Sequence, residues 1–265
     1  MMIKHQIKIL QSIATTILAG GQGFGGTATP RQPTQAIKLY DIEASQYCRR
    51  VREVLTLLNL DVEVYPCPKN GTRFRPEAEK IIKAFGKKIQ FPLLIDQNTG
   101  ATLQDSQEII DYLFKTYGKT GKTPKKWQNF QQRHILERLT SRVSLMRGLK
   151  ADPMNTYTAL PAKRLQLWSF EASPYTRLVR ERLCELELPY ILYNVPKERW
   201  QDMGLAALRV KPGKYVPLPN GKRSKEIMNM QGRLQVPYLV DNNTGVRMFE
   251  SEKILQYLNQ HYAGE

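Results

Sequence analysis

The chain has 265 residues, with 40 Lys and Arg against 24 Asp and Glu, which gives a formal net charge of +16. Such a charge favours binding to acidic surfaces, and it does not tell whether the partner is nucleic acid, anionic lipid or acidic protein. The apolar fraction of 41% and the charged fraction of 24% are those of a globular protein and exclude wholesale disorder. Three cysteines without a C-x-x-C pair exclude a disulfide framework, so we expect a reducing, cytoplasmic setting, with membrane association left open.

Residues 1–35 precede the first recognisable domain. Apolar residues recur at helical spacing in this segment and predict one apolar stripe. They are Ile3, Ile7, Leu10, Ala14 and Ile17. Because polar residues interrupt the run, an amphipathic helix that packs on the protein body or on a membrane face is favoured over a signal peptide. The helix is too short to span a bilayer. Residues 19–35, rich in Gly, Thr and Pro, are predicted to be a linker.

Residues 36–118 alternate strand and helix patterns. We predict strands at 37–40 and 62–65, parallel because the helix at 46–58 joins them. A second helix at 76–85 follows, and then a hairpin with strands at 92–95 and 101–104 around an Asn-Thr-Gly turn. A helix at 105–117 closes the unit. The order β-α-β-α-β-β-α is that of a thioredoxin-like domain.

The connector, residues 119–163, holds ten basic residues against two acidic ones, Glu137 and Asp152, and so carries half of the net charge. Apolar residues at helical spacing predict a basic amphipathic helix. They are Trp127, Ile135, Leu139, Val143 and Met146. A basic face docked on one domain is favoured over a dedicated lipid site. In the absence of a binding motif, no specific nucleic acid is predicted.

Residues 164–265 repeat the pattern of the first unit. IKLYDIEASQYCRRVRE (37–53) aligns without a gap with LQLWSFEASPYTRLVRE (165–181), and residues 91–118 align in the same way with 236–263. Self-similarity of this length predicts two copies of one domain. The second copy carries a longer segment, roughly 196–231, between its second strand and its hairpin.

Each copy places a serine, Ser45 or Ser173, at the corner between its first strand and first helix. The free N–H groups and dipole of such a helix start favour a thiolate. Serine cannot form a mixed disulfide, which excludes dithiol exchange, although Cys48 could act as a single thiol. Alternatively, the serines are simply helix N-caps, and Pro174 fits that interpretation.

Two further features recur in both copies. Phe91-Pro92 and Val236-Pro237 enter a strand, where proline is disfavoured unless it marks a special turn, and we expect both bonds to be cis. An acid and a serine begin the last helix: they are Asp105 with Ser106, and Glu250 with Ser251. These could cradle a carboxylate, or cap the helix with Asp105 and Ser251 as the caps.

Together with YPCPKNGTRFRPEAEK, FPLLIDQNTG and FESEKILQYL, these features resemble the N-terminal domain of glutathione S-transferases, a relative of glutaredoxin, present twice as in tandem proteins of plastids, cyanobacteria and other bacteria. The resemblance implies two thioredoxin-like domains (36–118 and 164–265) joined by the basic connector, with glutathione as ligand or co-substrate and no metal. Ser45 and Ser173 would stabilise the thiolate. The residues implied to hold glutathione are Phe91, Pro92, Asp105, Ser106 and Tyr47 in the first copy, and Val236, Pro237, Glu250, Ser251 and Tyr175 in the second.

Three functions fit this sequence. The first is a glutathione transferase, although the chain lacks the all-helical domain that supplies most of the electrophile pocket in transferases. The second is a non-catalytic protein that docks on an acidic partner or anionic membrane through residues 1–18 and 119–150. The third is monothiol redox chemistry at Cys48, disfavoured because the attacking thiol is missing. The second copy is the preferred site, since its Val-Pro and Glu-Ser match the transferase pattern more closely.

Overall fold

The computed structural model describes residues 2–18, 22–128, 146–154, 159–199 and 215–263. Helix α1 (Met2–Leu18) precedes the first half. The first half contains β1 (Ile37–Asp41), α2 (Gln46–Leu57), β2 (Val62–Pro66), α3 (Arg75–Ala84), β3 (Leu93–Asp96), β4 (Ala101–Gln104) and α4 (Ser106–Tyr117), followed by the short α5 (Lys125–Gln128). The second half contains β5 (Leu165–Ser169), α7 (Pro174–Glu185), β6 (Tyr190–Asn194), α8 (Arg223–Gln231), β7 (Tyr238–Asp241), β8 (Val246–Phe249) and α9 (Ser251–Tyr262). The fold is therefore mixed α/β, as predicted, and the two halves share one order of strands and helices.

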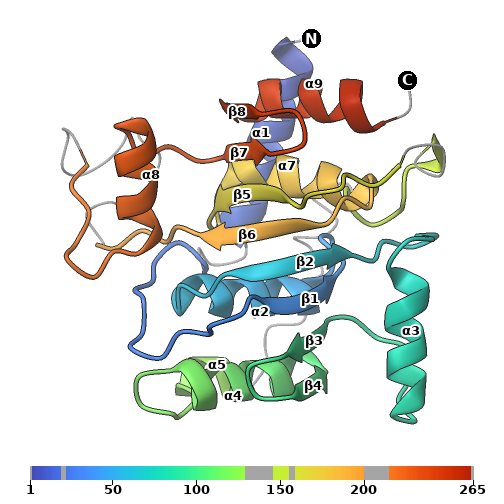
Figure 1. Ribbon diagram of the computed structural model, residues 1–265, viewed down its shortest axis with the longest axis vertical. Coiled ribbons are helices and arrows are strands. Elements are labelled where there is room, and N and C mark those ends of the chain that lie inside the picture. The colour runs from blue at the N-terminus through green and yellow to red at the C-terminus, as the bar shows by residue number, and fades with distance from the viewer. Residues whose placement is uncertain (1, 19–21, 129–145, 155–158, 200–214, 264–265) are drawn as a thin grey trace.

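One sheet runs through both halves in the order β4-β3-β1-β2-β6-β5-β7-β8 (Figure 1). Within each half the first two strands are parallel and the hairpin is antiparallel. The halves meet where β2 pairs antiparallel with β6, with Glu63 opposite Ile191. Because the strand order is equivalent from either edge, the halves are related by an approximate two-fold axis at this junction.

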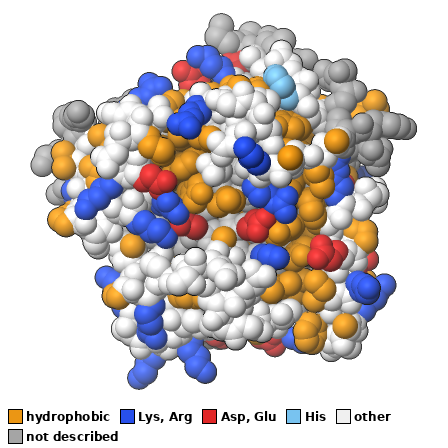
Figure 2. Space-filling view, in the orientation of Figure 1, with side chains coloured by type: hydrophobic (Ala, Val, Ile, Leu, Met, Phe, Trp, Pro, Cys, Tyr) orange, Lys and Arg blue, Asp and Glu red, His pale blue; other side chains and the backbone are white. Residues whose placement is uncertain are grey.

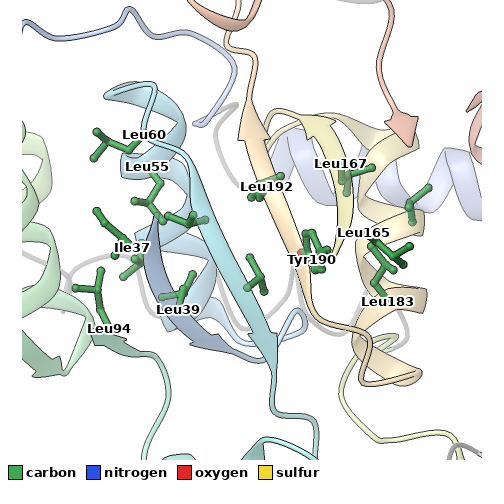
Figure 3. Close-up of a cluster of buried hydrophobic side chains, with 14 of the residues drawn as sticks. Ile37, Leu39, Leu55, Leu60, Leu94, Leu165, Leu167, Leu183, Tyr190 and Leu192 are labelled. Atoms are coloured by element: carbon green, nitrogen blue, oxygen red, sulfur yellow. The ribbon is translucent and has the colours of Figure 1, made fainter. Parts of the chain in front are cut away.

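The apolar core crosses the junction without a break. Val62 and Val64 of β2 belong to the same buried cluster as Tyr190 and Leu192 of β6, and Figure 3 shows side chains from the first and second halves in one layer. Each half also buries an aspartate at the end of its third strand. Asp96 accepts hydrogen bonds from two tyrosine hydroxyls of α4, and Asp241 accepts two from α9. Equivalent strands and helices therefore have equivalent internal contacts.

Helix α1 forms as predicted and packs against α7, but with a different face from the one expected. Ile9, Ser12 and Thr16 are buried, whereas Ile7, Leu10 and Ile17 are 50%, 65% and 70% exposed. Of the two surfaces expected to meet this stripe, the protein body and a membrane face, the protein body does not cover these three residues. Four hydrogen bonds to polar and backbone atoms, described below, hold the helix by its opposite side instead.

The segments before each half pair with the other half. Residues 22–35 were expected to be a linker, yet Gly25 bridges Lys197 of the second half, and Gly26 N donates to the Lys197 carbonyl at 3.2 Å. Correspondingly, Lys150 of the connector bridges Lys69 of the first half. Most of the predicted connector helix lies outside the described residues. The predicted inserted segment, 196–231, lies partly within them and ends in α8.

Candidate functional site

The corner of the second half holds Ser173 at the start of α7. Ser173 has extended backbone angles, and its Oγ accepts a hydrogen bond from Thr176 N at 3.3 Å, so it is the N-cap of the helix. Its Oγ also lies 2.9 Å from Thr176 Oγ1, where either hydroxyl can donate. When Thr176 donates, the Ser173 proton is free to point elsewhere. Pro174 fits at the first helical position, which lacks a hydrogen-bonded N–H in any case.

A pocket of about 270 Å³ opens beside this corner. Ser173, Tyr175 and Val236, three of the predicted site residues, line it together. Most of the remaining wall is apolar. It is formed by Ile13, Thr16 and Ile17 of α1, by Phe24, Phe170, Pro174, Val195, Pro196, Lys197 and Leu234, and by Gln235. The pocket thus brings together a hydroxyl at a helix N-terminus, a loop backbone and an apolar surface.

Both predicted proline bonds, Phe91-Pro92 and Val236-Pro237, are cis. Val236 is partly exposed at the pocket and Pro237 is buried behind it. The sequence therefore located the loop correctly in each half.

The start of α9 differs from its prediction. Glu250, with a φ of +71°, is the N-cap residue and makes no side-chain capping bond; its carboxylate lies 3.1 Å from Lys253. Ser251, expected to be the cap, is instead the first helical residue, and its Oγ lies 3.2 Å from Nε2 of His5. Neither residue lines the pocket described above. Helix α1 therefore covers the Ser251 hydroxyl, while no side chain of the N-cap residue occupies the first N–H groups of α9.

The first half arranges the same features differently. Ser45 caps α2 by accepting from Cys48 N at 3.4 Å, but it lines a polar crevice of only about 20 Å³ among charged residues. Phe91 lies in a buried apolar cluster with Cys48, against which Leu149 of the connector packs, and Arg75 lies over its ring at 5.1 Å. Ser45 and Phe91 therefore do not share the open pocket that Ser173 and Val236 share.

In the first half, the carboxylate of Asp105 itself binds the N–H groups at the start of α4. Asp105 Oδ1 accepts from Gln107 N at 2.8 Å and from Glu108 N at 3.3 Å, and Ser106 is buried. The predicted capping role of Asp105 is thus confirmed. A carboxylate that already fills the N–H groups of α4 competes with any external one. Tyr47 and Tyr175, at matching positions on α2 and α7, are both exposed.

Cys48 is fully buried, and its Sγ accepts a hydrogen bond from Ile42 N at 3.5 Å. Burial raises the pKa of this thiol well above its ordinary value, and the neighbouring Asp41 adds to the effect. Nucleophilic thiol chemistry needs the opposite shift. Cys67 and Cys184 are also buried with raised pKa values. The monothiol hypothesis is therefore not supported at Cys48.

A network of buried ion pairs joins the corner that holds Ser45 to the corner that holds Ser173. Arg52 Nε lies 3.0 Å from Glu171, and Arg180 Nη2 lies 3.1 Å from Glu43 and 3.0 Å from Glu171. Arg52 also pairs with Asp41 at 2.5 Å. Glu43 and Glu171 are the glutamates of the two Glu-Ala-Ser corners, so each corner is held by an arginine from the other half. Sequence analysis aligned these glutamates but gave them no role.

The pocket wall supplied by α1 was also missed. The sequence predicted that residues 1–18 form a helix, but not which half it covers. Lys197, at the pocket and 5.6 Å from the Phe170 ring, was not singled out by the sequence. Within the described ranges, no group of three or more His, Cys, Asp or Glu side chains is placed to hold a metal ion.

Comparison with family models gives a match to the glutathione S-transferase N-terminal domain over residues 39–123 and 202–265, more than half of the chain. The chain belongs to this family. The first match runs from within β1 through α4; the second contains α8 to α9 and begins after Ser173. No curated protein and no solved structure matches the chain. Membership in the glutathione S-transferase N-terminal domain family agrees with both proline-containing loops and with the thioredoxin-like order of each half.

Proposed function

We propose that the second half binds glutathione in the pocket at Ser173, and that the protein acts there as a glutathione transferase. The observation that carries the proposal is the shared pocket of Ser173, Tyr175 and Val236. A thiolate at this place would accept a hydrogen bond from the Ser173 hydroxyl and lie at the positive end of the α7 dipole. The backbone of Val236 would pair with the peptide, as the family resemblance implies.

The start of α9 would hold the γ-glutamyl carboxylate. Its N-cap residue, Glu250, leaves the first N–H groups of the helix without a side-chain acceptor, and such groups favour an anion. His5 and Ser251 would flank this end of the ligand, since they already lie 3.2 Å apart. This arrangement makes the second half the binding site and leaves the first half, where Asp105 fills the equivalent place, without one.

The apolar wall would receive the second substrate. Transferases of this family carry a separate helical domain for that purpose, whereas here Ile13 and Ile17 of α1 stand beside the corner together with Phe24 and Phe170. A pocket of about 270 Å³ is near the lower end of ordinary small-ligand sites. We therefore expect a compact apolar electrophile.

The test compares Ser173→Ala with Ser45→Ala in the full chain. Calorimetric titration should show glutathione binding to the native protein and to Ser45→Ala. Ser173→Ala should lower the conjugation rate with a generic aromatic electrophile by roughly 100-fold, as loss of one anion-stabilising donor does in other enzymes.

The thiolate absorbance of bound glutathione gives a second readout. It should appear at lower pH in the native complex than in the Ser173→Ala complex. Each serine caps a helix, so both variants lose roughly 1 kcal/mol of stability, and Ser45→Ala controls for that loss. Native protein that binds no glutathione, or equal activity of the two variants, would contradict the proposal.

A further inference from the structure

Helix α1 packs with its apolar side outward. Amphipathic helices on globular proteins normally turn the apolar stripe toward the core. Here the buried side carries Ser12, Thr15 and Thr16 with Ile9, whereas the exposed residues include Ile7, Leu10 and Ile17. The helix therefore presents to solvent the surface that an isolated helix would hide.

Polar contacts explain how this orientation is held. Arg177 Nη1 donates to the Ser12 carbonyl at 2.9 Å, and Thr16 Oγ1 donates to the Ala172 carbonyl at 3.2 Å. Arg147 donates to Gln11 Oε1 at 2.9 Å, and the contact of His5 with Ser251 was described above. These bonds engage specific groups of the second half and Arg147 of the connector, so hydrogen bonds fix the orientation of the helix. The apolar stripe therefore faces solvent because these contacts hold the opposite side of the helix against the protein.

The N-terminal segment that contains α1 is itself positively charged. Residues 1–40 contain four Lys or Arg and no Asp or Glu, and the first carboxylate, Asp41, is buried in an ion pair with Arg52. Lys8 is exposed on the helix itself. Glu252 interacts with His5, which lies on the packed side of the helix. Helix α1 lies behind the sheet in Figure 1, so Figure 2 shows the other face of the molecule, where Lys and Arg side chains are also spread.

We propose that the α1 stripe, defined as Ile7, Leu10 and Ile17, docks the protein on an anionic lipid surface. An exposed apolar face on a helix that carries two lysines and no Asp or Glu is what an interfacial helix needs, and such a helix sinks only into the headgroup region. Within the described residues, no helix is long and apolar enough to cross a bilayer.

A second copy of the chain fits the stripe less well. From Ile7 to Ile17 the helix axis advances roughly 15 Å, and the stripe is one helix wide. A stable protein interface buries about 800 Å² on each partner, which three side chains do not supply.

Docking would orient the pocket as well. Ile17 belongs both to the stripe and to the pocket wall. The pocket would then open beside the lipid surface, where apolar compounds concentrate. The docking itself does not depend on glutathione, so it and the proposed function can fail separately.

The experiment measures flotation of the full chain with vesicles of phosphatidylcholine and phosphatidylglycerol in equal parts, and with phosphatidylcholine alone. The native protein should bind the anionic vesicles more tightly, and added salt should weaken the binding. Leu10→Gln combined with Ile17→Gln should lower the partition coefficient roughly 10-fold or more, because two apolar side chains lose their burial. Lys8→Gln should lower it roughly fivefold.

Phe85→Gln is the matched control. Phe85 is 58% exposed at the end of α3 in the first half, away from the stripe, so this variant should bind as the native protein does. All variants change exposed residues, and unchanged circular dichroism establishes that they fold. Failure of the native protein to bind anionic vesicles overturns the proposal, as does equal binding by the double variant. A native dimer that the double variant dissociates would assign the stripe to a second copy instead.

Discussion

The corner of the first half and the corner of the second half begin from nearly the same sequence and end in different surroundings. Ser45 and Ser173 both cap a helix. Beside Ser173 lies an open pocket, whereas beside Ser45 the corresponding loop residue, Phe91, is packed into an apolar cluster with Leu149. The comparison shows that the thioredoxin-like frame sets where a site can form. The segment that packs over the corner determines whether a pocket remains beside the serine.

Each covering segment packs on the half that it does not directly precede in the sequence. Residues 24–26, which precede the first half, hydrogen-bond Lys197 of the second, and residues 149–151, which precede the second half, hydrogen-bond Lys69 of the first. Equivalent lysines thus receive different segments. The N-terminal segment contributes Phe24 to the pocket wall, while the connector contributes Leu149 to a filled cluster. Part of the difference between the halves therefore arises outside the repeated sequence.

The largest expected effect comes from the ion network beneath the corners. Arg52→Ala leaves Asp41, Glu43 and Glu171 short of a partner in a dry site, and removal of one member of a buried ion pair costs about 3–5 kcal/mol. In either variant the remaining arginine still pairs with both glutamates. Arg180→Ala should cost less, because only Arg52→Ala also removes the partner of Asp41, whose counterpart in the second half is the neutral Ser169. Urea unfolding midpoints measure the difference.

Lys87→Ala is the control for this pair of variants. Lys87 pairs with Glu108 at 3.0 Å, but both side chains are about half exposed, and such pairs contribute at most about 1 kcal/mol. Equal losses for Arg52→Ala and Arg180→Ala would show that Asp41 does not distinguish the halves. A loss as small as that of Lys87→Ala would show that the network does not stabilise the junction.

Glu181 provides a pH test of the second half. Burial raises the pKa of Glu181 to about 7, although Arg147 pairs with it at 2.7 Å. In the unfolded chain the pKa is near 4.5, so the folded state holds the proton more tightly. This contribution to stability is therefore fully present below pH 4.5, declines as pH rises toward 7, and changes little above it.

Glu181→Gln should remove this contribution. The measurement is the difference in unfolding free energy between native protein and variant across that pH window. The difference should change with pH from 4.5 to 7, because the native protein loses stability there by a route that the glutamine lacks. A pH-independent difference would mean that Glu181 does not titrate in this range.

Much of the fold could be predicted because the repeated stretches carry local signals. The Asn-Thr-Gly turns fix two hairpins, and the serines fix two helix starts, since each depends on a few adjacent residues. The proline-containing loops were also located correctly. By contrast, the joining of β2 to β6 and the pairing of Arg52 with Glu171 are long-range choices that neither repeat displays on its own.

The orientation of α1 could not be predicted from periodicity. Ile7, Leu10 and Ile17 define a stripe, but periodicity alone does not say whether protein, lipid or solvent meets it. Ser12, Thr16 and Gln11 decide the matter through hydrogen bonds to residues more than a hundred positions away. The pocket wall depends on that docking, so the composition of the candidate site was out of reach as well.

The smallest predicted effect separates the two helix starts at the outer hairpins. Asp105→Ala removes two side-chain hydrogen bonds to the N–H groups of α4 and should cost about 1 kcal/mol. Glu250→Ala removes only an exposed contact with Lys253 and should change stability by less than about 0.5 kcal/mol. Both residues have positive φ, 95° and 71°, so the strain of alanine in that conformation is common to the two variants.

Glutathione should stabilise native protein and Asp105→Ala by the same amount, since the proposed site lies in the other half. Stabilisation lost in Asp105→Ala but kept in Glu250→Ala would move the site to the first half.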